Sequence, residues 1–281
     1  MNHRATVSSA ALFLIVACAK QEAPPPPPAP PGPPAVVRIT ARDFSFEMQD
    51  TLTTGPTTFV LSDSGTELHH AQIVRFEEGK TVADLSSLKP GTPPPSWLVM
   101  MGGPNPSAPG GSEISTTVDL VPGNYALLCF IPSPAPDNRP HFTKGMVHPF
   151  TVIPTNDKRE SPAPHFTLSL ADYSFNFSAP LPAGQHDIKV VNSGPQEHEV
   201  VIVKLDAGKK AGDLLQWFGA GMKGPPPGTP VGGTAGMNPN GESIIHLNLT
   251  PGEYGMYCFV EDAKDGKMHV EHGMVSQFSV Q

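Results

Sequence analysis

Short apolar runs rich in Val, Ile, Leu, Phe and Tyr alternate with turn residues along most of the chain. Branched and aromatic side chains favour strands, whereas the Gly, Pro, Ser and Asp residues between the runs favour turns. The pattern predicts strands over residues 36–40, 57–62, 72–76, 114–120, 125–130, 150–153, 165–170, 186–191, 200–205, 243–249, 254–260 and 275–280. So many short strands predict an all-β fold of Greek-key sandwiches.

The strand pattern occurs twice, at a constant offset of 129 residues. The tetrapeptide at residues 43–46 recurs at 172–175, and Cys129 recurs as Cys258. A constant offset over such a span indicates two copies of one domain. The domains are expected at residues 36–154 and 165–281, joined by a linker at residues 155–164.

Each copy contains an insert that departs from the strand pattern, at residues 77–112 and 206–242. Residues 81–88 and 210–218 are expected to form short helices, and the remainder of each insert is expected to be Gly/Pro loop. The sequence therefore predicts two tandem β-sandwich domains, each with a short helical or loop insert.

The first residues have the features of an export signal. Arg4 precedes an apolar run at residues 10–17 that is too short to span a bilayer. The stretch before Cys18 resembles a bacterial lipobox, which implies a signal peptide at residues 1–17 and acylation of Cys18. Ala19 is similar to the residue found in lipoproteins sorted to the outer membrane. We expect an exported bacterial lipoprotein, anchored in the outer membrane and facing the periplasm or the cell surface; the alternative is an ordinary signal peptide with an incidental cysteine.

A proline tract follows the expected anchor. Residues 24–34, within the segment 18–35, are almost all proline. Such a tract favours extended polyproline II, so we expect a stiff spacer between the membrane and the folded domains.

The overall charge narrows the class of partner. The 281-residue chain carries a net charge of −8. Because nucleic-acid binding needs a basic surface, nucleic acid is not an expected partner.

Two cysteines remain after the lipidation site, and a disulfide between Cys129 and Cys258 is the simplest interpretation in an oxidising compartment. Equivalent positions in two intact sandwiches would, however, sit in two separate cores. A disulfide needs Cα atoms within about 7 Å, so each cysteine requires an explanation inside its own domain.

In each copy the cysteine is followed by a histidine and then by a methionine, and a further histidine lies upstream. The two sets are His69, Cys129, His141 and Met146, and His198, Cys258, His269 and Met274. Two imidazoles, one thiolate and a weak thioether are the ligands of a blue-copper electron-transfer site. A lone Cys or Met is usually structural, but two copies that keep the same four residue types favour one copper ion per domain, with more weight on the second.

These domains resemble cupredoxins, the plastocyanin and azurin superfamily. That family has an Asn-x-Gly turn before the first His, a Tyr shortly before the Cys, and a His-x4-Met stretch. The matching residues are Gly65, His69, Tyr125, Cys129, His141 and Met146 in the first copy, and Asn192, Gly194, His198, Tyr254, Cys258, His269 and Met274 in the second. Asp63 replaces the Asn in the first copy. The long Cys-to-His loops are similar to those of the first domain of copper nitrite reductases.

One departure from the family concerns the residue after the first His. Cupredoxins usually have a residue such as Asn there, which helps to organise the cysteine loop; this sequence has His70 and Glu199. Strand alternation predicts that His70 points away from the face that His69 occupies.

The resemblance implies a lipid-anchored copper protein with type 1-like sites that transfers electrons between periplasmic or surface protein partners. Copper storage or delivery is one alternative, and a metal-free binding or scaffold module is another. A copper oxidoreductase would need further histidines in His-x-His pairs or immediately before the cysteine, where this chain has Leu128 and Tyr257. On that ground the sequence predicts that the protein is not an enzyme.

Overall fold

The computed structural model describes Met1 and residues 30–88, 92 and 94–281. Residues Pro31–Gln281 form one compact unit. The expected signal peptide at 1–17, the lipidation site Cys18 and most of the spacer lie outside the described residues. Within the described part of the chain, no helix is both long and apolar enough to cross a membrane.

The prediction of an all-β fold is confirmed, and every predicted strand range overlaps a strand of the structure. The first sandwich consists of β1 to β9. One of its sheets contains β2 (Ser45–Glu47), β1 (Ala35–Arg42), β4 (Gly55–Asp63) and β7 (Ile114–Leu120), and the other contains β3 (Thr51–Thr53), β9 (Val147–Ile153), β8 (Gly123–Leu128), β5 (Gln72–Phe76) and β6 (Leu98–Met100).

The second sandwich, β10 to β17, repeats this arrangement. One sheet contains β11 (Ser174–Phe177), β10 (Phe166–Ala171), β12 (Gly184–Asn192) and β15 (Glu242–Leu249), and the other contains β14 (Gly228–Met237), β13 (His198–Leu205), β16 (Gly252–Tyr257) and β17 (Val275–Val280). Burial alternates along strands such as β4, where Thr57, Phe59 and Leu61 face inward. This period of two is what a sheet with one covered face requires.

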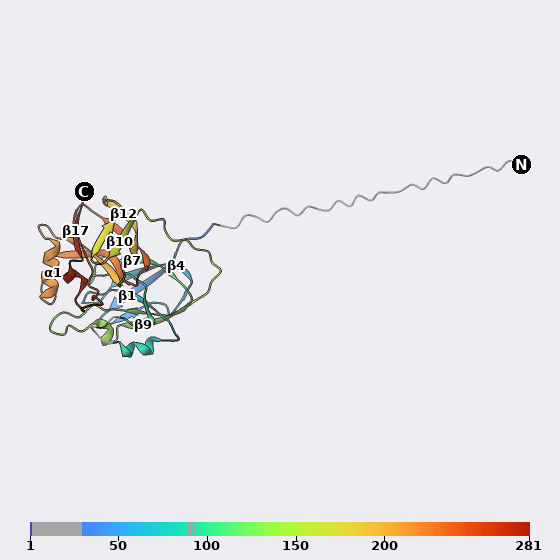
Figure 1. Cartoon of the computed structure of the whole chain (residues 1–281), viewed down its shortest axis with the longest axis horizontal. Helices are drawn as coiled ribbons and strands as arrows, with labels where there is room; N and C mark the ends of the chain where they lie inside the picture. Colours follow the sequence, from blue (N-terminus) through green and yellow to red (C-terminus); the bar gives the residue numbers. More distant parts are fainter. Residues whose placement is uncertain (2–29, 89–91, 93) are drawn as a thin grey trace. The chain divides into compact units, whose positions relative to one another are not determined.

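The two sandwiches share a sheet. Strands β7 and β15 pair antiparallel, which joins the sheet of β2, β1, β4 and β7 and the sheet of β11, β10, β12 and β15 into one eight-stranded sheet. Figure 1 labels β12, β10, β7, β4 and β1 of this sheet. Thr116 pairs with Ile245, and these positions are equivalent under the 129-residue repeat. The pairing therefore relates the two copies by an approximate twofold axis that passes through this residue pair.

The inserts are more ordered than the sequence predicts. Helix α1 (Ala211–Gly219) lies close to its expected range, and a 3-10 helix, η1 (Val82–Ser87), forms in the first insert. The prediction that the remainder is Gly/Pro loop is wrong for β6 and β14. Strand β14 forms despite four glycines because β13 supplies backbone partners along nearly its whole length, with register shifts that accommodate the irregular backbone.

Candidate metal centres

Three predicted ligands of the first copy converge at one end of the sandwich. His69 lies just before β5, Cys129 directly follows β8, and His141 opens the 3-10 helix η2 (His141–Lys144). The Nδ1 atoms of the two histidines are 3.1 Å apart, and Sγ of Cys129 lies 3.4 Å from Nδ1 of His141. All three side chains are fully buried.

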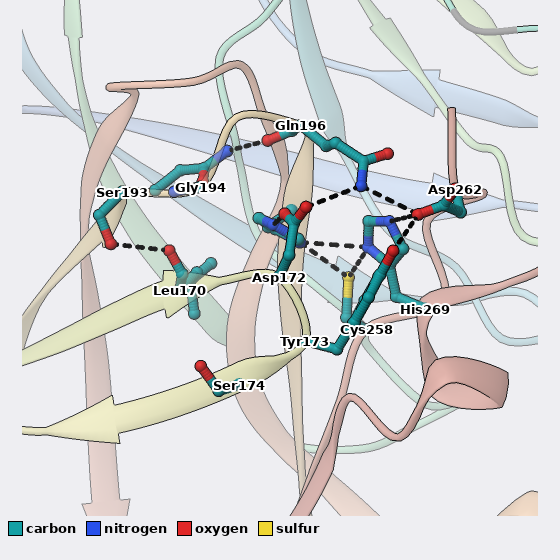
Figure 2. A network of polar contacts seen from close by, with 12 residues as sticks. Leu170, Asp172, Tyr173, Ser174, Ser193, Gly194, Gln196, Cys258, Asp262 and His269 are labelled. Atoms are coloured by element: carbon teal, nitrogen blue, oxygen red, sulfur yellow. Dashed lines mark hydrogen bonds and ion pairs between the residues drawn. The ribbon is translucent and has the colours of Figure 1, made fainter. Parts of the chain in front are cut away.

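The second copy builds the same arrangement (Figure 2). Nδ1 of His198 is 3.1 Å from Nδ1 of His269, and Sγ of Cys258 lies 3.9 Å and 3.4 Å from these two atoms. In each copy the three donor atoms lie within 4.8 Å of one another. The structure thus brings together, twice, residues that are far apart in the sequence.

The two predicted methionines lie close to these centres along the chain. Met146 and Met274 are fully buried in the same hydrophobic clusters as Cys129 and Cys258, respectively. In each copy the Met N–H donates to the carbonyl of the second histidine, for example Met146 to His141 at 3.1 Å. The intervening 3-10 turn therefore places each methionine beside its histidine.

A carboxylate holds the outer nitrogen of the first histidine in each centre. Nε2 of His69 lies 2.8 Å from Oδ1 of Asp43, and Nε2 of His198 lies 2.8 Å from Oδ1 of Asp172. Because an ionised carboxylate can only accept a hydrogen bond, the histidine must carry its proton on Nε2. The lone pair of Nδ1 then points into the centre. Burial raises the pKa of Asp43, but hydrogen bonds from Thr66 and His69 outweigh it and hold that pKa below its usual value.

The second histidines are held differently in the two copies. Nε2 of His141 lies 2.8 Å from Oε2 of Glu67, whereas Nε2 of His269 is 3.7 Å from the nearest oxygen of Asp262 and has no hydrogen-bond partner among the described residues. The same Asp262 oxygen already accepts from the Tyr173 hydroxyl at 2.6 Å and from a side-chain amide at 2.9 Å (Figure 2). The two centres therefore share one architecture but differ in the support of one ligand.

Both cysteines are free and buried. Desolvation raises the pKa of Cys129 to about 12 and raises that of Cys258 well above its usual value. Such thiols are poor nucleophiles at neutral pH, but a bound metal ion supplies the positive charge that ionises a coordinating thiol. One soft sulfur and two imidazole nitrogens, all excluded from water, form a donor set that fits copper.

The residues that depart from the family pattern support the cysteine loops after all. Nε2 of His70 accepts from the N–H of Phe130 at 2.8 Å, and Oε1 of Glu199 accepts from the N–H of Phe259 at 2.9 Å. Phe130 and Phe259 are the residues that follow the two cysteines. His70 does point away from the metal centre, as strand alternation predicts, but it reaches the cysteine loop from the other side.

Sequence reasoning missed the supporting carboxylates. Asp43 and Asp172 lie in the tetrapeptides that recur at the repeat offset, so the signal was present without a role attached to it. Glu67 and Asp262 do not occupy equivalent positions in the two copies, so the repeat could not have identified them.

Comparisons with known proteins find similarity only among solved structures. No protein-family model matches the chain, and none of the curated proteins is significantly similar. Among solved structures, auracyanin from Roseiflexus castenholzii is 22% identical over 42% of this chain and 99% of its own, with a TM-score of 0.28. The blue copper oxidase from Nitrosomonas europaea is 15% identical over 88% of this chain and 86% of its own, with a TM-score of 0.26. The copper-containing nitrite reductase from Thermus scotoductus is 11% identical over 88% of this chain and 61% of its own, with a TM-score of 0.22.

The fold and the two His-Cys-His centres together define a protein of two β-sandwiches, each with a buried donor set at one end that could hold a metal ion. This description rests on the two sandwiches and on the residues that meet at the end of each.

The prediction that the chain is not an enzyme is wrong. It rested on the lack of His-x-His pairs and of a histidine before either cysteine. The structures that align with most of the chain include an oxidase and a reductase, which are enzymes.

Proposed function

We propose that each sandwich binds one copper ion through its two histidines, its cysteine and its methionine, and that the two type 1-like centres transfer electrons. The observation that supports this most is the twofold recurrence of a buried thiol between two Nδ1 atoms, with carboxylates on the outer nitrogens. Soft thiolate and imidazole ligands in a dry site stabilise both copper oxidation states.

Further proposals concern the cellular setting. The protein would be anchored through acylated Cys18 in the outer membrane, with the domains in the periplasm or at the cell surface. Its partners there would be proteins that exchange electrons or copper. The lipobox-like sequence and the proline tract support this setting.

A visible spectrum tests the copper centres. The chain from Pro31 onward, loaded with Cu(II), is expected to show an intense thiolate-to-copper band with two copper ions bound. Cys129→Ser and Cys258→Ser should each remove about half of the band, and the double variant should remove all of it. Stoichiometric copper without this band would instead favour storage or delivery, and no copper binding would favour a metal-free scaffold.

A second candidate function, a copper oxidoreductase that acts on a small molecule, is favoured by a cleft. The cleft has a volume of about 1170 Å³ and is lined by both sandwiches. Its walls include Glu67 and Asp262, the carboxylates next to the second histidines, together with aromatic side chains such as Trp217. A small reduced substrate that contacts Glu67 or Asp262 in this cleft would be separated from the nearby centre only by that carboxylate and the histidine beside it.

Turnover separates the two candidates. An oxidoreductase should oxidise a small aromatic donor continuously with a soluble one-electron acceptor, and Ala263→Trp, at an exposed position of the cleft wall, should slow it. A carrier should exchange electrons only in proportion to its copper, and Ala263→Trp should leave that exchange unchanged.

A further inference from the structure

Three buried polar side chains link the two cysteine loops across the boundary between the sandwiches. Nδ1 of His70 lies 3.1 Å from Oδ1 of Asn105, and Nδ2 of Asn105 donates to Oε2 of Glu199 at 2.8 Å. The exposed fractions of His70, Asn105 and Glu199 are 5%, 1% and 7%. We call this set the His-Asn-Glu bridge.

The outer ends of the bridge reach the metal centres. His70 follows His69 in sequence and accepts from the N–H after Cys129; Glu199 follows His198 and accepts from the N–H after Cys258. An unbroken path of hydrogen bonds thus runs from one cysteine loop to the other. Such buried networks can be worth more than the sum of their separate bonds.

Each donor in the bridge faces an acceptor. Because Nε2 of His70 accepts from a backbone N–H, its proton must lie on Nδ1, which therefore donates to the Asn105 oxygen. The amide of Asn105 then donates to a Glu199 carboxylate oxygen. The Asn105 side chain accepts through its oxygen and donates through its nitrogen, so it matches one donor and one acceptor. Two histidines that both donate, or two glutamates that both accept, would leave one end of the amide unmatched.

The two ends of the bridge occupy equivalent positions in the repeat. His70 and Glu199 are related by the 129-residue offset, but His70 donates to the bridge and Glu199 accepts from it. A single asparagine can therefore bond to both. In the shared sheet the copies meet through equivalent residues, such as Thr116 and Ile245. The bridge is instead an asymmetric contact, because its two ends are equivalent positions that hold different residue types.

We propose that the His-Asn-Glu bridge couples the two metal centres, so that copper in one centre raises the copper affinity of the other. The inference rests on the proposed function, because it assumes that both centres bind copper. Metal at the first centre fixes Cys129 and the N–H that follows it, and so fixes His70. Asn105 and Glu199 are then already ordered when the second metal arrives, so the second site loses less conformational entropy on binding.

Reciprocity provides a quantitative test. Copper(I) affinities are measured by competition with a chromophoric chelator in the wild-type chain, in Cys129→Ser, which retains only the second centre, and in Cys258→Ser, which retains only the first. Filling either centre is expected to raise the affinity of the other by about 5-fold or more, by the same factor in both directions.

A variant of the bridge should remove this factor. In Asn105→Leu the two centres should bind copper independently while both thiolate-to-copper bands remain. Asn105→Asp, which keeps the contact to His70 and loses the donor to Glu199, provides a second variant in case the first folds poorly. Asn238→Ala is the matched control, because Oδ1 of Asn238 accepts from the N–H of Met100 across the same boundary at 2.7 Å without contacting the bridge; it should retain the coupling.

Amide hydrogen exchange provides a readout that does not depend on activity. In Cys258→Ser, copper can enter only the first centre, and we expect it to slow exchange at the N–H of Phe259 in the second. Asn105→Leu should abolish this effect. Independent affinities in the wild-type chain, an unchanged Phe259 amide, or coupling that survives loss of Asn105 would each overturn the proposal. A lack of the thiolate-to-copper bands in the wild-type chain would instead refute the proposed function.

Discussion

The carboxylate behind the first histidine should influence how firmly each proposed centre binds copper. Asp43 and Asp172 fix the tautomer of the ligand and increase the basicity of its imidazole. Since a more basic imidazole favours Cu(II) over Cu(I), these aspartates should also lower the reduction potential.

Replacing one of these aspartates should therefore weaken one centre. Asp172→Asn is expected to lower the Cu(II) affinity of the second centre by about 10- to 100-fold and to raise its potential. Asp187→Asn is the matched control, because Asp187 pairs with His246 at 2.7 Å away from both centres. Equal behaviour of the two variants in chelator competition and potentiometry would contradict this role.

The second histidines predict a difference between the two centres. Glu67 accepts a hydrogen bond from His141, but in the part of the chain that the structure describes no acceptor lies within hydrogen-bond distance of Nε2 of His269. The first centre should therefore favour Cu(II) more and have the lower reduction potential. Spectroelectrochemical titration of Cys258→Ser and Cys129→Ser measures the two centres separately; equal potentials, or a higher potential in the first, would show that Glu67 does not have this effect.

At the scale of single residues, the sequence predicted that two histidines and one cysteine of each copy would lie together, but not what supports them. Repetition of these residues at a nearly constant spacing was enough to group them; their role as metal ligands stays a prediction. The roles of Glu67 and His70 depend on contacts with residues that are distant in the sequence, His141 and Phe130. A local sequence pattern does not predict such contacts. The cysteine-loop support by His70 and Glu199 was hidden because neither residue type is the usual one.

Among the structural elements, β14 is the one that depends most on its glycines. Gly233 has a φ of +145°, and a Cβ at this position would lie 2.0 Å from the carbonyl oxygen of Val200. Its counterpart Gly103, in the first insert, has a φ of +127° and similarly leaves no room beside the carbonyl of Ala71. These glycines allow each insert to pack backbone against backbone with the segment that follows the first histidine of its own sandwich.

A pair of glycine variants separates backbone strain from this close approach. Gly184 also has a positive φ, +123°, but a Cβ added there would meet no atom within 4 Å. Gly184→Ala should reduce the free energy of unfolding by about 1–2 kcal/mol, and Gly233→Ala by about 1–3 kcal/mol more. Denaturant unfolding measures both; similar losses would mean that the close approach at Gly233 has no energetic weight.

The sequence could not predict β14 as a strand, because a run with Gly232, Gly233 and Gly236 has the composition of a loop. Tertiary pairing with β13 overrides that local preference. By contrast, alternating strands such as β4 were predictable because their own residues define a buried and an exposed face.

At the scale of the whole molecule, the shared sheet makes the two sandwiches one structural unit. Side chains add to the pairing of β7 with β15: Thr117 and His246 of these strands are hydrogen-bonded at 2.8 Å, and Thr116 donates to the carbonyl of Gly233 in β14 at 3.0 Å. The repeat in the sequence indicated two copies but not this contact, because an edge strand and a shared strand have the same pattern of residues.

Such an interface predicts cooperative unfolding. Scanning calorimetry of the metal-free chain from Pro31 should give one transition whose calorimetric and van't Hoff enthalpies agree. Two resolved transitions would show that the sandwiches unfold independently and that the shared sheet contributes little to stability.

The proposed copper binding depends on one arrangement, in which each sandwich gathers one thiol and two imidazoles around a common point. Anomalous diffraction at the copper edge, from copper-loaded crystals, locates the metal without relying on spectra or activity. We expect two strong peaks, each among the donor atoms of one triad: His69, Cys129 and His141, or His198, Cys258 and His269. Copper found instead only at the more exposed group of Asp262, Asp265 and His272, with no peak at either triad, would contradict this arrangement as the copper site.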